Sequence, residues 1–322
     1  MPLNPGSAHI DAALTDISLA YKQDADAFKA ESIFPVVPVA KQSDKYFTFD
    51  KAAWLRSEAG QLAPGAETRG ANFTLSNSSY YCDVIGVHMD VSDQLRGNAD
   101  EALDIDTSAT EYVTEQILLK REIDCFAMVF ETSSWTGSST GSDLAGGAQF
   151  TKWSTVSSTP VADVNLQVEN IKKNTGRAPN VLCLSRDVFT TLNKNTDILD
   201  RIRYTERGVV TEDLLAGLFG VERVIVGDAV KNGAAEGAAA SMSFVASDTA
   251  WLGYVAPSPG LMTPSAGYMM AWNGLAGVSA GGVQIQKMRL DTRFSDRVAG
   301  VSSYDFVRTG ADYGALFTDV IA

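Results

Sequence analysis

The sequence predicts an α+β fold in which an N-terminal arm and a long β-hairpin extend from a body of helices and sheets. Three observations predict it: a proline-stiffened apolar segment near the N-terminus, a long polar stretch between two strand candidates, and one long apolar helical stripe followed by alternating helix and strand signals. The 322 residues suit one large domain or two modest ones. A content of 45% hydrophobic and 20% charged residues is ordinary for a globular protein.

Residues 1–45 are expected to form the arm, with a helix over residues 11–30. The apolar segment that follows this helix holds two prolines three residues apart, which excludes a helix interior and a central strand. Such an extended segment must lie on a surface, either that of its own domain or that of a neighbouring subunit, and the sequence leaves both open. The residues expected to make arm contacts are Phe34, Pro35, Val36, Val37 and Pro38.

Residues 46–91 are predicted to form the long hairpin. Residues 46–49 favour a strand, and on the expected return side the apolar residues between Ile85 and Val91 alternate with small or polar ones. The stretch 54–70 between them is too polar to bury itself, so we expect it to project and to contact an adjacent subunit. The candidate contact residues in it are Trp54, Arg56, Glu58, Leu62, Glu67 and Arg69.

A helix is predicted over residues 108–131, inside a domain expected to span 92–179. Ser108 and Glu111 have the spacing of a capping box, and an apolar stripe follows at intervals of three, four or seven residues. At 1.5 Å per residue the helix would be about 36 Å long.

Residues 160–280 have the mixed signals of an α/β unit, with a domain boundary expected near residue 180. One helix in it should begin at Thr211 as N-cap and end at Gly220. The last segment, 281–322, returns to strand character, and the change of parity between Ile285 and Met288 suggests a bulge.

The charge and the rare residue types exclude several classes of function. The chain has 26 basic and 39 acidic residues, a net charge of −13, which argues against avid binding of nucleic acid. Two histidines and three widely spaced cysteines predict no metal site, no cofactor and no disulfide framework. No signal peptide and no apolar run long enough for a membrane span is present in the sequence, so a cytoplasmic origin is expected. A site built only from carboxylates stays open, because spatial pairing is invisible in sequence.

The order of these segments resembles that of the major capsid proteins of tailed bacteriophages, whose fold also builds encapsulin shells. The resemblance spans nearly the whole chain, and the stretches that carry it best are residues 33–46, 179–189 and 291–321. It implies that 46–91 is the extended loop and 108–131 the spine helix of a peripheral domain. It further implies that 180–280 is the axial domain and that 281–322 closes the peripheral domain.

The resemblance implies a structural subunit that is not an enzyme. Copies of it would form hexamers and pentamers in an icosahedral shell around phage DNA, in a virion assembled from chains made in the cytoplasm of a bacterial host. Because the extended loop begins by residue 46, the resemblance implies either a separate scaffold protein, which Met1 favours, or a chain that is already processed. A portal and a decoration protein are its other expected partners. Contact with the packaged DNA would be non-specific, and no membrane would be involved. The alternatives are an encapsulin-type compartment and, from another class, a carboxylate-dependent cytoplasmic hydrolase.

Overall fold

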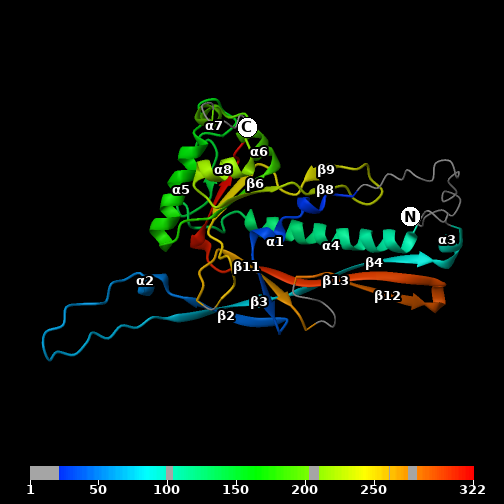
Figure 1. Cartoon of the computed structure of the whole chain (residues 1–322), viewed down its shortest axis with the longest axis horizontal. Helices are drawn as coiled ribbons and strands as arrows, with labels where there is room; N and C mark the ends of the chain where they lie inside the picture. The colour runs from blue at the N-terminus through cyan, green and yellow to red at the C-terminus, as the bar shows by residue number, and fades with distance from the viewer. Residues whose placement is uncertain (1–21, 99–103, 203–209, 261, 275–280) are drawn as a thin grey trace.

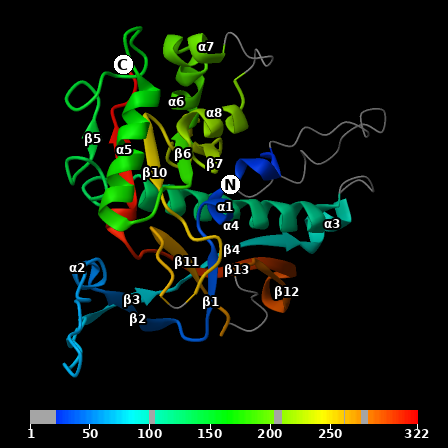
Figure 2. The same ribbon diagram turned by 60° about the vertical axis from the view of Figure 1, so that its left-hand side comes forward.

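The chain folds into two α+β units joined side by side, with a hairpin that projects from the first (Figure 1). This computed structural model describes residues 22–98, 104–202, 210–260, 262–274 and 281–322. In the first unit a long helix lies along a sheet, and in the second unit several shorter helices pack with another sheet, as Figure 2 shows from a second direction. The expected α+β class is therefore observed.

The sheet of the first unit is organised around one long strand, β13. Strand β13 pairs with β4 along one edge. Along the other edge its first half pairs with β12 and its last part with β11, and all three pairings are antiparallel. The proline-bearing strand β1 pairs in parallel with β11 at the end of the sheet, as expected for a strand that cannot be central. The bounds are β1 Val36–Val39, β4 Asp83–Ser92, β11 Gly267–Trp272, β12 Gln284–Leu290 and β13 Ser295–Arg308.

Helix α4, Ile105–Val129, covers one face of this sheet. It begins earlier than the expected 108–131, because the side chain of Asp104 accepts hydrogen bonds from the backbone N–H groups of Asp106 and Thr107. The helix approaches the sheet closely at Gly300, where a Cβ atom would lie 2.5 Å from a methyl carbon of Val113. Glycine at this position therefore lets helix and sheet pack together.

The second unit is built on a sheet with the strand order β5-β14-β10-β6-β7. The interior strand β6, between β10 and β7, is buried along its whole length, and helices α5 to α8 pack in the same hydrophobic core. Helix α8 confirms the expected caps: Thr211 accepts from the N–H of Leu214, and Gly220 adopts the left-handed conformation at φ 67°. The bounds are β5 Leu144–Ala145, α5 Pro160–Thr175, β6 Val181–Ser185, α6 Arg186–Leu192, α7 Thr196–Ile202, α8 Glu212–Phe219, β7 Arg223–Gly227, β10 Thr249–Gly253 and β14 Gly314–Thr318.

The two units do not follow the segment boundaries expected from the sequence. Helix α5, inside 92–179, packs in the core of the second unit, whereas β11, inside 180–280, pairs in the sheet of the first. The closing segment 281–322 is shared, because β12 and β13 belong to the first sheet and β14 to the second. Sequence shows the order of the strands but not their partners. The expected bulge in β12 is also absent, since its register with β13 is continuous.

The projecting hairpin consists of β2, Ser43–Phe49, and β3, Leu75–Tyr81, joined by the loop 50–74 (Figure 1). The expectation that the strand over 85–91 would be the return strand is wrong, because that strand is β4, which pairs with β13. Its apolar alternation arises because one of its faces lies under α4. The true return strand, Leu-Ser-Asn-Ser-Ser-Tyr-Tyr, is polar and mostly exposed, so its sequence signal is weak.

The arm is described from Lys22 onward, and most of the expected helix over 11–30 lies outside the described residues. Its described part is not a continuous helix. It holds a 3-10 turn, η3 (Ala25–Ala27), and the start of the short helix α1 (Ala30–Ile33). Across the described parts of the chain, no helix is both long and apolar enough to cross a bilayer.

Candidate functional site

The loop at the end of the hairpin is tied to the body of the chain at its base. It opens with the short helix α2, Lys51–Trp54, whose N-cap Asp50 accepts from the N–H of Ala52 at 3.0 Å. Lys51 forms an ion pair with Asp312, and Asp312 also accepts a hydrogen bond from the hydroxyl of Thr136. Burial opposes ionisation of Asp312, but the hydrogen bonds from Lys51 and Thr136 prevail and lower the pKa of its carboxyl group.

An aromatic cluster, defined here as Phe49, Trp54 and Phe73, gathers where the loop leaves the two strands. The ring centroid of Trp54 lies 6.1 Å from that of Phe49 and 5.7 Å from that of Phe73. The centroids of Phe49 and Phe73 are 6.0 Å apart. Trp54 is 52% exposed and Phe73 is 56% exposed. Contiguous exposed aromatic surface on a projection is typical of a surface that another molecule covers.

The other expected loop contacts are also exposed and are spread along the loop. Arg56 and Glu58 form an ion pair at 3.5 Å with both side chains largely in solvent. Leu62 is exposed as well, and the guanidinium group of Arg69 lies beside Gly60, where an added Cβ would be 3.1 Å from Cζ. Glu67 is exposed and has no ion-pair partner among the described residues. The structure thus joins Trp54 to aromatic neighbours and Arg56 to Glu58, and it brings neither Leu62, Glu67 nor Arg69 to the aromatic cluster.

The expected arm residues differ in how far the chain itself buries them. Phe34 is fully buried in the core shared by the two units, with its ring 5.9 Å from that of Trp251. It is therefore unavailable to a neighbouring subunit. Pro35, Val36 and Val37 are half-buried along β1, and Pro38 is exposed. Of the expected arm contacts, Pro38 is the one with an open side chain.

Sequence reasoning missed Phe49 and Phe73 as members of the aromatic cluster and Asp312 as the anchor of Lys51. An aromatic residue at each end of the polar stretch is the signal that could have revealed the cluster. The pairing of Lys51 with Asp312 joins residues 261 positions apart and left no signal in the sequence.

The described residues offer no grouping of histidine, cysteine and acidic side chains that could hold a metal ion. His88 is exposed on β4, and His9 lies outside the described residues. The three cysteines are free and buried, and burial raises the pKa of the Cys82 thiol to about 11. A thiol with a raised pKa is a poor nucleophile at neutral pH.

No protein-family model matches the chain. Its sequence is 25% identical over 221 residues to the major capsid protein of Burkholderia phage BcepMu. The aligned residues cover 69% of this chain and 69% of that protein. It is 26% identical over 225 residues to the major capsid protein of Pseudomonas phage JBD67, covering 69% of this chain and 70% of that protein.

Among solved structures, the chain is similar to a phage-related protein from Bordetella bronchiseptica, with a TM-score of 0.68, 26% identity and 97% of both chains covered. It is similar to the capsid of the cyanophage P-SCSP1u, with a TM-score of 0.64 at 11% identity over 98% of this chain and 93% of that one. The SrpI encapsulin of Synechococcus elongatus matches with a TM-score of 0.56 at 11% identity, covering 98% of this chain and 96% of that one.

Proposed function

We propose that this chain, a shell-forming structural subunit with the major capsid fold of tailed phages, holds neighbouring copies of itself through the tip of its projecting hairpin. The observation that carries the proposal is the aromatic cluster, which sits on a projection and which the chain does not cover. A neighbouring subunit in a shell would supply the missing cover.

The comparisons confirm the expected fold and the expected structural role. Both sequence relatives are major capsid proteins, which are structural proteins and not enzymes, so the hydrolase alternative is set aside. The same relatives place the chain in a virion capsid as a homo-oligomer. The likeness to an encapsulin reflects the shared fold, and the sequence relatives favour the phage capsid.

The aromatic side chains would contribute more to such a contact than the charged ones. Full burial of a large apolar side chain contributes about 1.5–3 kcal/mol, so the exposed halves of Trp54 and Phe73 are each worth roughly 1 kcal/mol. An exposed ion pair such as Arg56–Glu58 contributes about 0–1 kcal/mol. We therefore assign the main share of the affinity to the aromatic cluster and the orientation of the contact to Arg56, Glu58, Glu67 and Arg69.

Hexamers and pentamers are the capsomers that we propose, because a closed shell uses heterologous contacts around rotation axes and a projecting hairpin can reach an adjacent copy. We further propose that chains made in the host cytoplasm assemble on a separate scaffold protein. The shell would include a portal, and a decoration protein would bind the finished shell. The net charge of −13 supports only non-specific proximity to packaged DNA.

The proposal is tested by replacing residues 56–69 with a short Gly-Ser linker and, separately, by the double variant Trp54→Ala, Phe73→Ala. We expect near-native circular dichroism and melting for both, with shells absent or unstable by light scattering and negative-stain microscopy. Leu166→Ala is a matched control, since Leu166 is 53% exposed on α5, far from the loop in sequence. Shells of parental stability from the double variant would contradict the proposal.

A further inference from the structure

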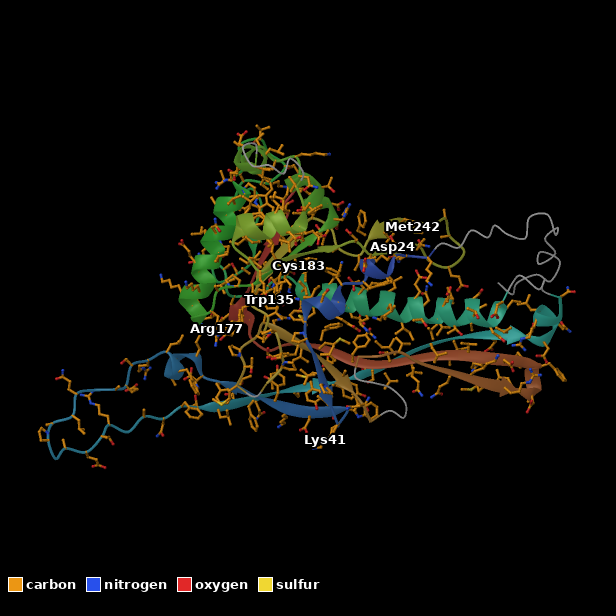
Figure 3. All side chains as sticks on the ribbon, in the orientation of Figure 1. Asp24, Lys41, Trp135, Arg177, Cys183 and Met242 are labelled. Atoms are coloured by element: carbon orange, nitrogen blue, oxygen red, sulfur yellow. The ribbon has the colours of Figure 1, made fainter. Side chains whose placement is uncertain are left out.

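The N-terminal segment 22–34 crosses from one unit to the other and touches both. Its C-terminal end is anchored by Ile33 and Phe34, which are fully buried in the shared core. The residues before them pass over helix α4 toward the hairpin formed by β8 (Val230–Asn232) and β9 (Met242–Phe244) of the second unit (Figure 1). Figure 3 labels Asp24, in this segment, close to Met242.

Hydrogen bonds to two carboxylates of α4 hold the first part of this segment. A cavity of about 400 Å³ lies between it and α4, lined by Gln23, Phe28, Thr114, Leu118 and Arg121 among others. Polar contacts hold the segment at either end of the cavity. At one end the buried carboxylate of Glu122 accepts from the backbone N–H groups of Lys29 and Ala30, at 2.9 and 2.8 Å.

At the other end, Gln23 contacts both units at once. Its backbone N–H donates to the carboxylate of Glu115 on α4 at 2.9 Å. Its side-chain amide donates to the carbonyl oxygen of Val230 at 2.8 Å, and its amide oxygen accepts from the N–H of Val230 at 2.9 Å. One residue thus joins the helix of the first unit to the first strand of the hairpin in the second.

The two hydrogen bonds between Gln23 and Val230 depend on how the two units are oriented. The units meet in the shared core at Phe126 and Gly227, where a Cβ on Gly227 would lie 2.7 Å from Phe126 Cζ. Glu115 precedes Phe126 by eleven residues, so the Gln23 contact lies about 16 Å along the helix from this pivot. A rotation of about 10° at the pivot would move Val230 relative to α4 by about 3 Å, which is enough to break both bonds between Gln23 and Val230.

We infer that Gln23, with Glu115 and Val230, forms a latch that is closed only in the observed orientation of the two units. When the units rotate about the shared core, Gln23 releases Val230, and the segment over the cavity keeps only its contacts with α4 at that end. The latch is a property of the single chain, so the inference stands independently of the proposed shell contacts.

Amide hydrogen exchange and a distance measurement test the latch in the full chain. Gln23→Ala removes both side-chain bonds to Val230 without touching the core. We expect exchange at the Val230 amide to rise at least tenfold, and exchange at Gln23 and Ala30 to rise with it, although the substitution removes neither of their acceptors. Lys22→Ala is the matched control, since it removes only an exposed ion pair with Glu111. It should leave the Val230 amide protected.

Spin labels at Tyr112→Cys on α4 and Leu166→Cys on α5, whose helix packs in the core of the second unit, report the orientation of the units. Both positions are exposed, and the native cysteines are buried, so the labels attach selectively. We expect a narrow distance distribution in the otherwise unchanged chain and a broader or shifted one after Gln23→Ala. Faster exchange confined to Val230, with an unchanged distribution, would overturn the latch and leave Gln23 as a local hydrogen bond.

A variant at the pivot provides an independent test. Gly227→Ala presses on Phe126, whose ring supplies the three atoms nearest to the added Cβ, and leaves the side chain of Gln23 in place. If the latch closes only in the observed orientation of the units, Gly227→Ala shifts that orientation. Hydrogen exchange at the Val230 amide then rises, as it does for Gln23→Ala. A folded Gly227→Ala chain with a shifted label distance and a fully protected Val230 amide would overturn the inference. If that variant does not fold, the exchange and distance data on Gln23→Ala decide alone.

Discussion

Two antiparallel strand pairs of the first unit differ in what covers them. In the pair β4–β13, Val91 and Val298 are fully or almost fully buried beneath helix α4. In the pair β2–β3, Phe47 is 58% exposed and Leu75 is 51% exposed. The register is continuous in both pairs, so the difference lies in burial. An uncovered two-stranded hairpin is marginally stable by itself, whereas a covered sheet is stable.

The hairpin is attached to the body at its base. Tyr46 and Tyr80 pack against a small core that includes Cys82, Tyr268 and Met270. Beyond this base the ion pair of Lys51 with Asp312 also ties the loop to the body, while the apolar side chains of the outer strands and loop, such as Phe47, Leu62 and Leu75, are exposed. The chain therefore concentrates its own stability in the covered sheets. It leaves the outer part of the hairpin for contacts that another molecule completes.

The largest effect in this comparison is expected from a covered position. Trp251 on β10 is fully buried, with its ring centroid 5.1 Å from that of Trp135 and 5.9 Å from that of Phe34. Trp251→Ala should lower the free energy of unfolding by about 3–5 kcal/mol, because the removed indole leaves a cavity among large rings. Urea unfolding followed by circular dichroism measures the loss. A decrease below 1 kcal/mol would show that this core is not where the stability resides.

An intermediate effect is expected from the buried carboxyl group of Glu122. Burial raises its pKa to about 7, against the opposing influence of the hydrogen bonds from Lys29 and Ala30. Between pH 4.5 and 7 the folded chain therefore binds a proton that the unfolded chain has released. The free energy of unfolding contributed by this group falls as pH rises through that window, by roughly 3 kcal/mol at most.

Glu122→Gln removes this titration. The parent should lose stability relative to the variant between pH 5 and pH 7.5, as measured by urea unfolding at both pH values. Taking the difference between the two proteins cancels the titration of the other carboxyl groups. Parallel pH profiles for parent and variant would show that Glu122 is ionised throughout the range, and that its bonds to the two backbone N–H groups outweigh burial.

The covered regions were also the ones that the sequence could predict. The caps of α8 and the buried strand β6 left clear patterns, because helix ends and covered strands restrict which residue types fit. Strand β3 left almost none, since both of its faces meet solvent and neither selects apolar residues. The assignment of β4 to the hairpin is wrong for the same reason. β4 is the nearest strand with a clear apolar alternation, so the sequence favours it over β3 as the partner of β2.

The candidate site was predictable in its place but not in its composition. A polar stretch between strand signals located the loop, and Trp54 stood out within it. The partners of Trp54 depend on where the chain folds back: Phe73 returns beside it across nineteen positions of sequence. Gln23 was equally invisible, because its contacts with Glu115 and Val230 span 92 and 207 positions.

The smallest effect is expected at the hairpin tip in the isolated chain. Phe73→Ala removes a ring that is 56% exposed and touches only Phe49 and Trp54 among the aromatic residues. Because little apolar surface returns to water, the free energy of unfolding should change by less than about 0.5 kcal/mol, as is usual for a surface substitution. Urea unfolding of the unassembled subunit measures this, with Trp251→Ala as the reference for a covered ring. A loss above 2 kcal/mol would mean that the aromatic cluster stabilises the chain's own fold. The contrast between the covered sheets and the open hairpin would then fail, because the tip would be part of the core and not a surface awaiting a neighbour.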